Sequence, residues 1–159
     1  MKISKGHFHN QVLAWGLIVD PRDQGIEEDL SLDLEVIGKA DGCEYLKKCF
    51  LGQNRSMVWI KSWHGCSHEE VEFLKSHLGL SVKDVLSEDC WFEFNLPDQN
   101  LIKIIEIIIS SPNGWIVYIY LENKILLIWE SEIIDVFSRS ENKLPGILIG
   151  VRCGVEIKG

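Results

Sequence analysis

Two apolar segments, residues 115–121 and 125–130, are separated by only three polar residues, Glu122, Asn123 and Lys124. Segments of this length on either side of so short a connection predict a β-hairpin. A hairpin joins antiparallel strands, whereas parallel strands need a crossover of about a dozen residues or more. This pair of segments therefore constrains the fold more than any other feature, because it requires a sheet that is at least partly antiparallel.

Further strands are predicted from hydrophobic patterning. Residues 30–36 alternate strictly between apolar and polar side chains, and residues 90–96 do the same, so each segment predicts a strand with one buried face. Residues 57–63 have strand composition, and residues 12–19 are apolar at both parities, which predicts a central strand covered on both faces. A last strand is predicted over residues 147–157.

The best-marked helix is predicted over residues 68–78. Ser67 and Glu70 form a capping-box pattern, in which a hydroxyl and a carboxylate each satisfy a free backbone N–H at a helix start. Gly79 supplies the residue that most readily adopts the left-handed conformation at a helix end. These start and stop signals agree on the same boundaries.

A second helix is predicted over residues 101–109, although isoleucine-rich composition alone would suit a strand. Lys103, Glu106 and Ser110 fall at spacings that place them in one narrow polar stripe on a helix. A strand would put Lys103 and Glu106 on opposite faces. Shorter helices are predicted over residues 43–51, 81–86 and 131–137.

These elements follow one another in an irregular order, without the strict alternation of strand and helix seen in doubly wound parallel folds. The chain has 159 residues, which is the length of one domain of usual size, about 100–200 residues. No repeat, linker or break in composition divides it. We therefore predict an α+β fold, a single globular domain over residues 1–159, with a mainly antiparallel sheet and helices packed on one face.

The charge balance argues against polyanionic partners. The chain carries 16 Lys and Arg against 24 Asp and Glu, a formal net charge of −8, which repels nucleic acid and anionic membranes. The acidity lies in two blocks. Residues 20–35 contain seven acidic residues and one basic residue, and residues 67–106 contain nine acidic and three basic residues.

A cytoplasmic location with unpaired thiols is expected. His7 and His9 interrupt what would otherwise be the start of a signal peptide, and the longest apolar runs, 104–109 and 115–121, are far shorter than the roughly 18 residues of a membrane span. Five cysteines form an odd set without CxxC spacing, as in reduced cytosolic proteins. They are Cys43, Cys49, Cys66, Cys90 and Cys153.

His64, Cys66 and His68 form a cluster with the residue types of a metal or thiol site. Ser67, as the predicted helix cap, bends the chain between Cys66 and His68, and no standard spacing supplies further ligands. Cys66 beside a helix start with His64 as base would suit a thiol enzyme, but no third group accompanies them. We expect no metal, no cofactor and no catalytic residues, and keep a small cytosolic enzyme at this cluster as the alternative.

The first acidic block is the predicted partner-binding site. It combines a polar loop with the polar face of the adjacent predicted strand, whereas the glutamates at 69, 70 and 72 are partly explained by their place at a helix start. Carboxylates of this kind attract and orient a basic protein. The predicted contact residues are Asp20, Asp23, Glu27, Glu28, Asp29, Asp33 and Glu35.

In size and charge the chain is similar to bacterial immunity proteins, which protect a cell from nuclease toxins and occur on unrelated folds. The resemblance implies a non-catalytic inhibitor that neutralises a basic toxin domain by covering its active surface. It rests on no motif. A regulatory or structural domain that self-associates through an exposed strand is a further alternative, and the oligomeric state stays open.

Overall fold

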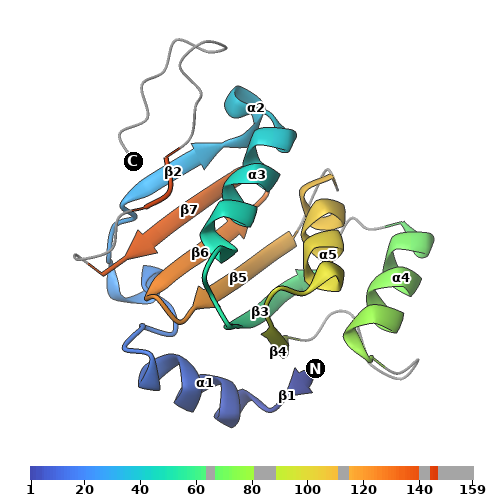
Figure 1. Ribbon diagram of the computed structural model, residues 1–159, viewed down its shortest axis with the longest axis horizontal. Coiled ribbons are helices and arrows are strands. Elements are labelled where there is room, and N and C mark those ends of the chain that lie inside the picture. Colours follow the sequence, from blue (N-terminus) through green and yellow to red (C-terminus); the bar gives the residue numbers. More distant parts are fainter. Residues whose placement is uncertain (64–66, 81–88, 111–114, 140–143, 147–159) are drawn as a thin grey trace.

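The computed structural model describes residues 1–63, 67–80, 89–110, 115–139 and 144–146, and it has an α+β fold (Figure 1). The described strands form one antiparallel sheet in the order β1-β4-β3-β5-β6-β7-β2, which confirms the predicted fold class. The strands are β1 (Lys2–Ile3), β2 (Leu30–Asp33), β3 (Arg55–Trp63), β4 (Cys90–Asn95), β5 (Trp115–Leu121), β6 (Ile125–Glu130) and β7 (Ile133–Ser138). The helices are α1 (Lys5–Ala14), α2 (Leu34–Ile37), α3 (Lys39–Phe50), α4 (His68–Leu78) and α5 (Gln99–Ser110), with a 3-10 turn, η1, at Arg22–Gln24.

The predicted hairpin is confirmed as β5 and β6, with Leu121 opposite Ile125 beside the turn. The chain then turns again at once, and Ser131 adopts a positive φ of 56° in this second turn. The helix predicted over residues 131–137 is therefore wrong. This segment is β7, which pairs with β6 on one side and β2 on the other, so the ladders on both sides satisfy its backbone.

The strand predicted over residues 12–19 is also wrong, because α1 occupies most of it. Ser4 caps this helix by accepting a hydrogen bond from the His7 N–H at 3.1 Å. Phe8 and Val12, one turn apart, are fully buried, and Gly16 follows the helix end with a φ of +74°. The apolar run straddles the end of a helix and the segment after it, so its lack of periodicity did not indicate a strand.

The strand predicted over residues 30–36 ends at Asp33, earlier than the alternating pattern suggests. The Asp33 carboxylate accepts a hydrogen bond from the Glu35 N–H at 2.9 Å and so caps α2. A capping bond at this point competes with continuation of the strand. The alternation therefore predicted the strand correctly but not its end.

The helices α2, α3, α4 and α5 pack on one face of the sheet (Figure 1). The helices predicted over 43–51, 68–78 and 101–109 are confirmed, and the capping box at the start of α4 is present in full. The helix predicted over 81–86 and the strand predicted over 147–157 lie outside the described residues.

The sheet separates two hydrophobic cores of different composition. We call the side under α2 to α5 the aliphatic face, because isoleucine, leucine and valine dominate it. The opposite side, covered by α1 and the segment that follows it, is the aromatic face, and its core was not predicted because α1 was not. Its buried residues are Phe8, Val12, Leu17, Met57, Trp59, Tyr118, Tyr120, Leu126, Ile128 and Phe137.

Candidate protein-binding edge

Three carboxylates gather where β2, the last strand of the sheet, runs into α2. We call Asp33, Glu35 and Glu132 the acidic edge. The backbone brings them together, because the Leu34 N–H donates to the Glu132 carbonyl at 2.7 Å and Asp33 caps α2. Residues almost a hundred positions apart in the chain thus meet at one point of the surface.

The carboxyl groups of Glu35 and Glu132 lie close enough to share a hydrogen bond when one of them is protonated. This contact and the negative charges of Glu132 and Asp33 raise the pKa of Glu35 above its usual value. Within the described part of the chain, none of the three carboxylates forms an ion pair with a lysine or arginine. The acidic edge therefore holds like charges together, and a cation from outside would relieve their repulsion.

Apolar side chains flank these carboxylates. Ile133 lies directly opposite Asp33 in the β2–β7 ladder and is 43% exposed. Val36, on α2, is exposed to the same extent. Exposed aliphatic groups beside uncompensated charge are typical of surfaces that bind proteins.

The structure divides the predicted partner-binding residues into two groups. Asp20 points inward, with its side chain 10% exposed, and accepts hydrogen bonds from the Tyr118 hydroxyl at 3.1 Å and the Arg22 N–H at 3.2 Å. Asp29 accepts hydrogen bonds from the backbone N–H and the hydroxyl of Ser138. These two carboxylates hold the loop to the sheet.

The remaining predicted residues are exposed. Asp23, Glu27 and Glu28 lie in the connection between α1 and β2, and Asp33 and Glu35 lie at the acidic edge. Arg22, the one base in this block, is occupied, since its guanidinium donates to both Glu130 and Asp135. It also ties the connection to β6 and β7, so the exposed carboxylates stand on an anchored segment.

Sequence reasoning missed Glu132. It lies in the segment that was predicted to be a helix, and only the turn between β6 and β7 brings it to β2. The β-branched and aromatic composition of residues 133–137, which are isoleucine, valine or phenylalanine at four of five positions, was an available signal for a strand there. The pairing with Glu35 had no signal in the sequence, because it depends on which strands are neighbours.

The histidine and cysteine cluster is only partly visible. His64 and Cys66 lie outside the described residues, and His68 is the exposed first residue of α4. Among the residues that the structure describes, no three histidine, cysteine or carboxylate side chains are placed to hold a metal ion. Burial raises the pKa of the Cys49 thiol to about 12 and raises that of Cys43 as well, which disfavours the nucleophilic thiolate at both.

No protein-family model, curated protein or solved structure matches the chain. Over its described residues, none of the helices has both the length and the apolar character that crossing a membrane requires.

Proposed function

We propose that this protein is a non-catalytic binding protein of the bacterial cytoplasm that neutralises a basic protein, in the manner of an immunity protein against a nuclease-type toxin. The observation that carries the proposal is the carboxyl pair of Glu35 and Glu132 beside Asp33, held together without a cation in the described part of the chain. A lysine or arginine of the partner would supply the missing charge.

The surface next to this pair extends the proposed contact. Asp23, Glu27 and Glu28 are exposed and add negative charge that attracts a basic partner over a distance of about 10 Å at moderate salt. Ile133 and Val36 offer apolar contact area beside the acidic edge. Asp20 and Asp29 contribute indirectly, because their hydrogen bonds fix the loop that carries the other three.

Binding of a cation at the acidic edge has a defined pH dependence. A positive charge beside Glu35 favours its ionised form and lowers its raised pKa. Complex formation then releases a proton, so affinity should increase as the pH rises through the pKa of free Glu35. An interface elsewhere on the protein would not lower the pKa of Glu35.

The test uses the purified product of the neighbouring gene in the native genome as the candidate partner. We expect Glu35→Lys with Glu132→Lys to weaken binding at least a hundredfold, because two attractive contacts become repulsive. The matched control is Glu69→Lys with Glu72→Lys, which changes net charge equally on the exposed surface of α4. Equal losses in both variants would show that only net charge matters and would refute a site at the acidic edge.

A second variant separates the loop from the acidic edge. Glu27→Lys with Glu28→Lys removes two exposed carboxylates that make no structural bond in the described residues. We expect a slower association rate and a weaker salt dependence with little change in dissociation, because long-range attraction acts mainly on encounter. An unchanged association rate would remove the loop from the interface.

A further inference from the structure

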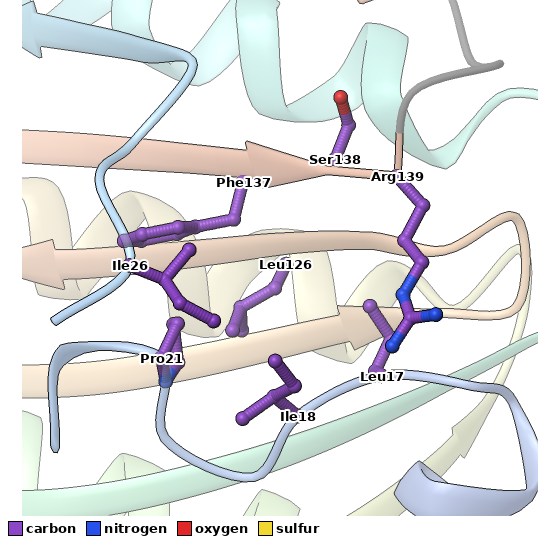
Figure 2. A pocket seen from close by; sticks show the side chains of 8 residues that line it. All are labelled: Leu17, Ile18, Pro21, Ile26, Leu126, Phe137, Ser138 and Arg139. Atoms are coloured by element: carbon purple, nitrogen blue, oxygen red, sulfur yellow. The ribbon is translucent and has the colours of Figure 1, made fainter. Parts of the chain in front are cut away.

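A cavity of about 240 Å³ opens on the aromatic face, between the segment that follows α1 and the strands β6 and β7 (Figure 2). Six apolar side chains form most of its wall. Leu17, Ile18, Pro21 and Ile26 come from the segment, and Leu126 and Phe137 come from the strands. Leu126 and Phe137 are buried, whereas Ile26 is 41% exposed and stands at the opening.

The size of this cavity limits what it can hold. An apolar cavity of about 150 Å³ accepts benzene, and sites for drug-sized ligands begin at roughly 300 Å³. A volume of 240 Å³ lies between these values. The apolar part of a ligand would therefore be a single substituted ring or a short alkyl chain.

One end of the cavity is cationic. The Arg139 side chain runs across the strand ends toward Leu17 (Figure 2). The backbone N–H of Arg139 donates to the Lys124 carbonyl at 3.4 Å, so the two residues are neighbours. The Lys124 side chain reaches toward Gly16, the residue before Leu17, because a Cβ built on Gly16 would lie 4.0 Å from Lys124 Cε. Both side chains are exposed, and neither forms an ion pair with a described residue.

The carboxylate of Asp29, beside the cavity wall, is hydrogen-bonded to Ser138. Ser138 lines the cavity wall, yet its hydroxyl points away from the other lining side chains (Figure 2) and donates to Asp29 at 3.2 Å. The Asp29 carboxylate also accepts the Ser138 N–H. In a chain of net charge −8, Arg139 at the cavity and its neighbour Lys124, neither of which forms an ion pair with a described residue, are a local exception to the overall charge.

We propose that this cavity binds a small amphipathic carboxylate, whose short apolar tail lies among Leu17, Leu126 and Phe137 and whose carboxylate meets Arg139, with Lys124 adding positive charge at the same end. A guanidinium and a carboxylate form paired, charge-assisted hydrogen bonds, and the apolar wall supplies the remaining affinity. This site is separate from the acidic edge and does not depend on the proposed partner.

The test compares three probes of the same chain length: octanoate, 1-octanol and octylammonium. Binding is followed by NMR shifts of the backbone amides of residues 17–26, β6 and β7. We expect saturable binding of octanoate, about tenfold weaker binding of octanol, which lacks the charge-assisted bonds, and the weakest binding for octylammonium.

Two variants locate the site. Arg139→Gln should lower octanoate affinity toward that of octanol, with the remaining difference due to Lys124, and leave octanol unchanged. Ile26→Trp should fill the opening and abolish binding of both. The matched control is Ile133→Trp, because Ile133 is exposed to nearly the same extent, 43% against 41%, but lies at the opposite end of β7. It should bind both probes like the unaltered protein.

Three results would overturn the proposal. Equal affinity for octanoate and octanol, or preference for octylammonium, would show that Arg139 does not select a carboxylate. Loss of binding in Ile133→Trp to the same degree as in Ile26→Trp would place the ligand elsewhere. Shifts that increase without saturation for every probe would mean that there is no site. None of these results bears on the acidic edge, so the two proposals fail separately.

Discussion

The two faces of the sheet are buried by different means. The aliphatic face lies under four helices, and its core consists mainly of isoleucine, leucine and valine. In the part of the chain that the structure describes, the aromatic face is covered by α1 and the segment after it, and its core is rich in tyrosine, tryptophan and phenylalanine. Both faces are contributed by the same strands, since neighbouring residues such as Tyr118 and Ile119 point to opposite sides.

The difference shows how a thin cover is held in place. On the aromatic face, tyrosines serve as both core and anchor, since the Tyr118 hydroxyl donates to Asp20 at 3.1 Å and the Tyr120 hydroxyl donates to the Val19 carbonyl. Burial raises the pKa of both phenols, which keeps these hydroxyls protonated as donors. The aliphatic face needs no such bonds, because helices satisfy their own backbone.

The largest loss of stability should follow a substitution in the core of the aromatic face. Phe8 is fully buried and packs edge-on against Tyr120, with ring centroids 5.2 Å apart. We expect Phe8→Ala to reduce the free energy of unfolding by about 3–5 kcal/mol, as for other buried aromatic residues. Chemical denaturation measures it, with Leu13→Ala, 59% exposed on the same helix, as a control that should change little. A loss below about 1 kcal/mol would mean that α1 is a loose cover rather than part of a core.

Substitutions in the core of the aliphatic face should lower the free energy of unfolding by a similar or slightly smaller amount. Leu74 on α4 and Ile105 on α5 are 0% and 5% exposed. We expect Leu74→Ala and Ile105→Ala each to cost about 2–5 kcal/mol, from lost burial and the cavity that remains. The shift in denaturant midpoint reports the loss, and Ile102→Ala, at a half-buried position of α5, should cost less. Values near zero at Leu74 or Ile105 would contradict the packing described for that helix.

The anchoring hydroxyls should contribute less than the cores. Tyr120→Phe keeps the ring but removes the donor to Val19, and we expect a loss of about 1 kcal/mol, the usual net value of one hydrogen bond. Tyr118→Phe should cost less, because Asp20 still accepts from the Arg22 N–H. Thermal unfolding of the two variants gives the comparison. Equal stability of Tyr120→Phe and the unaltered protein would show that the segment is held by apolar contacts alone.

The smallest effect on stability should come from the acidic edge, which belongs to neither core. Because the pKa of Glu35 is raised in the folded protein, its contribution to stability is present below the usual glutamate pKa and is lost as the pH rises through the raised value. We expect Glu132→Gln to lower the pKa of Glu35 toward its usual value in a carboxyl NMR titration. Glu72→Gln, on the exposed side of α4, should leave it unchanged. An unchanged pKa in Glu132→Gln would show that the two carboxyls do not interact.

Prediction from sequence succeeded where the local signal was redundant. The helix at residues 68–78 had a capping box, an apolar stripe and a terminal glycine, and α5 had a polar stripe that a strand could not produce. It failed at residues 12–19 and 131–137, which are short and apolar or mixed, so that periodicity does not distinguish helix from strand there. Of the acidic block, sequence identified the charges but not that Asp20 and Asp29 bond to the sheet.

Local patterning by itself determined the antiparallel hairpin at residues 115–130, the main helices of the aliphatic face and the concentration of acid between residues 20 and 35. Only the tertiary structure decided that β7 would lie between β6 and β2, that Asp20 and Asp29 would bond to the sheet, and that Glu132 would meet Glu35. The physical reason is the separation along the chain of the residues that interact. Turns, caps and amphipathic stripes arise within a few residues, whereas strand neighbours and the contacts across them depend on how the whole apolar surface is buried.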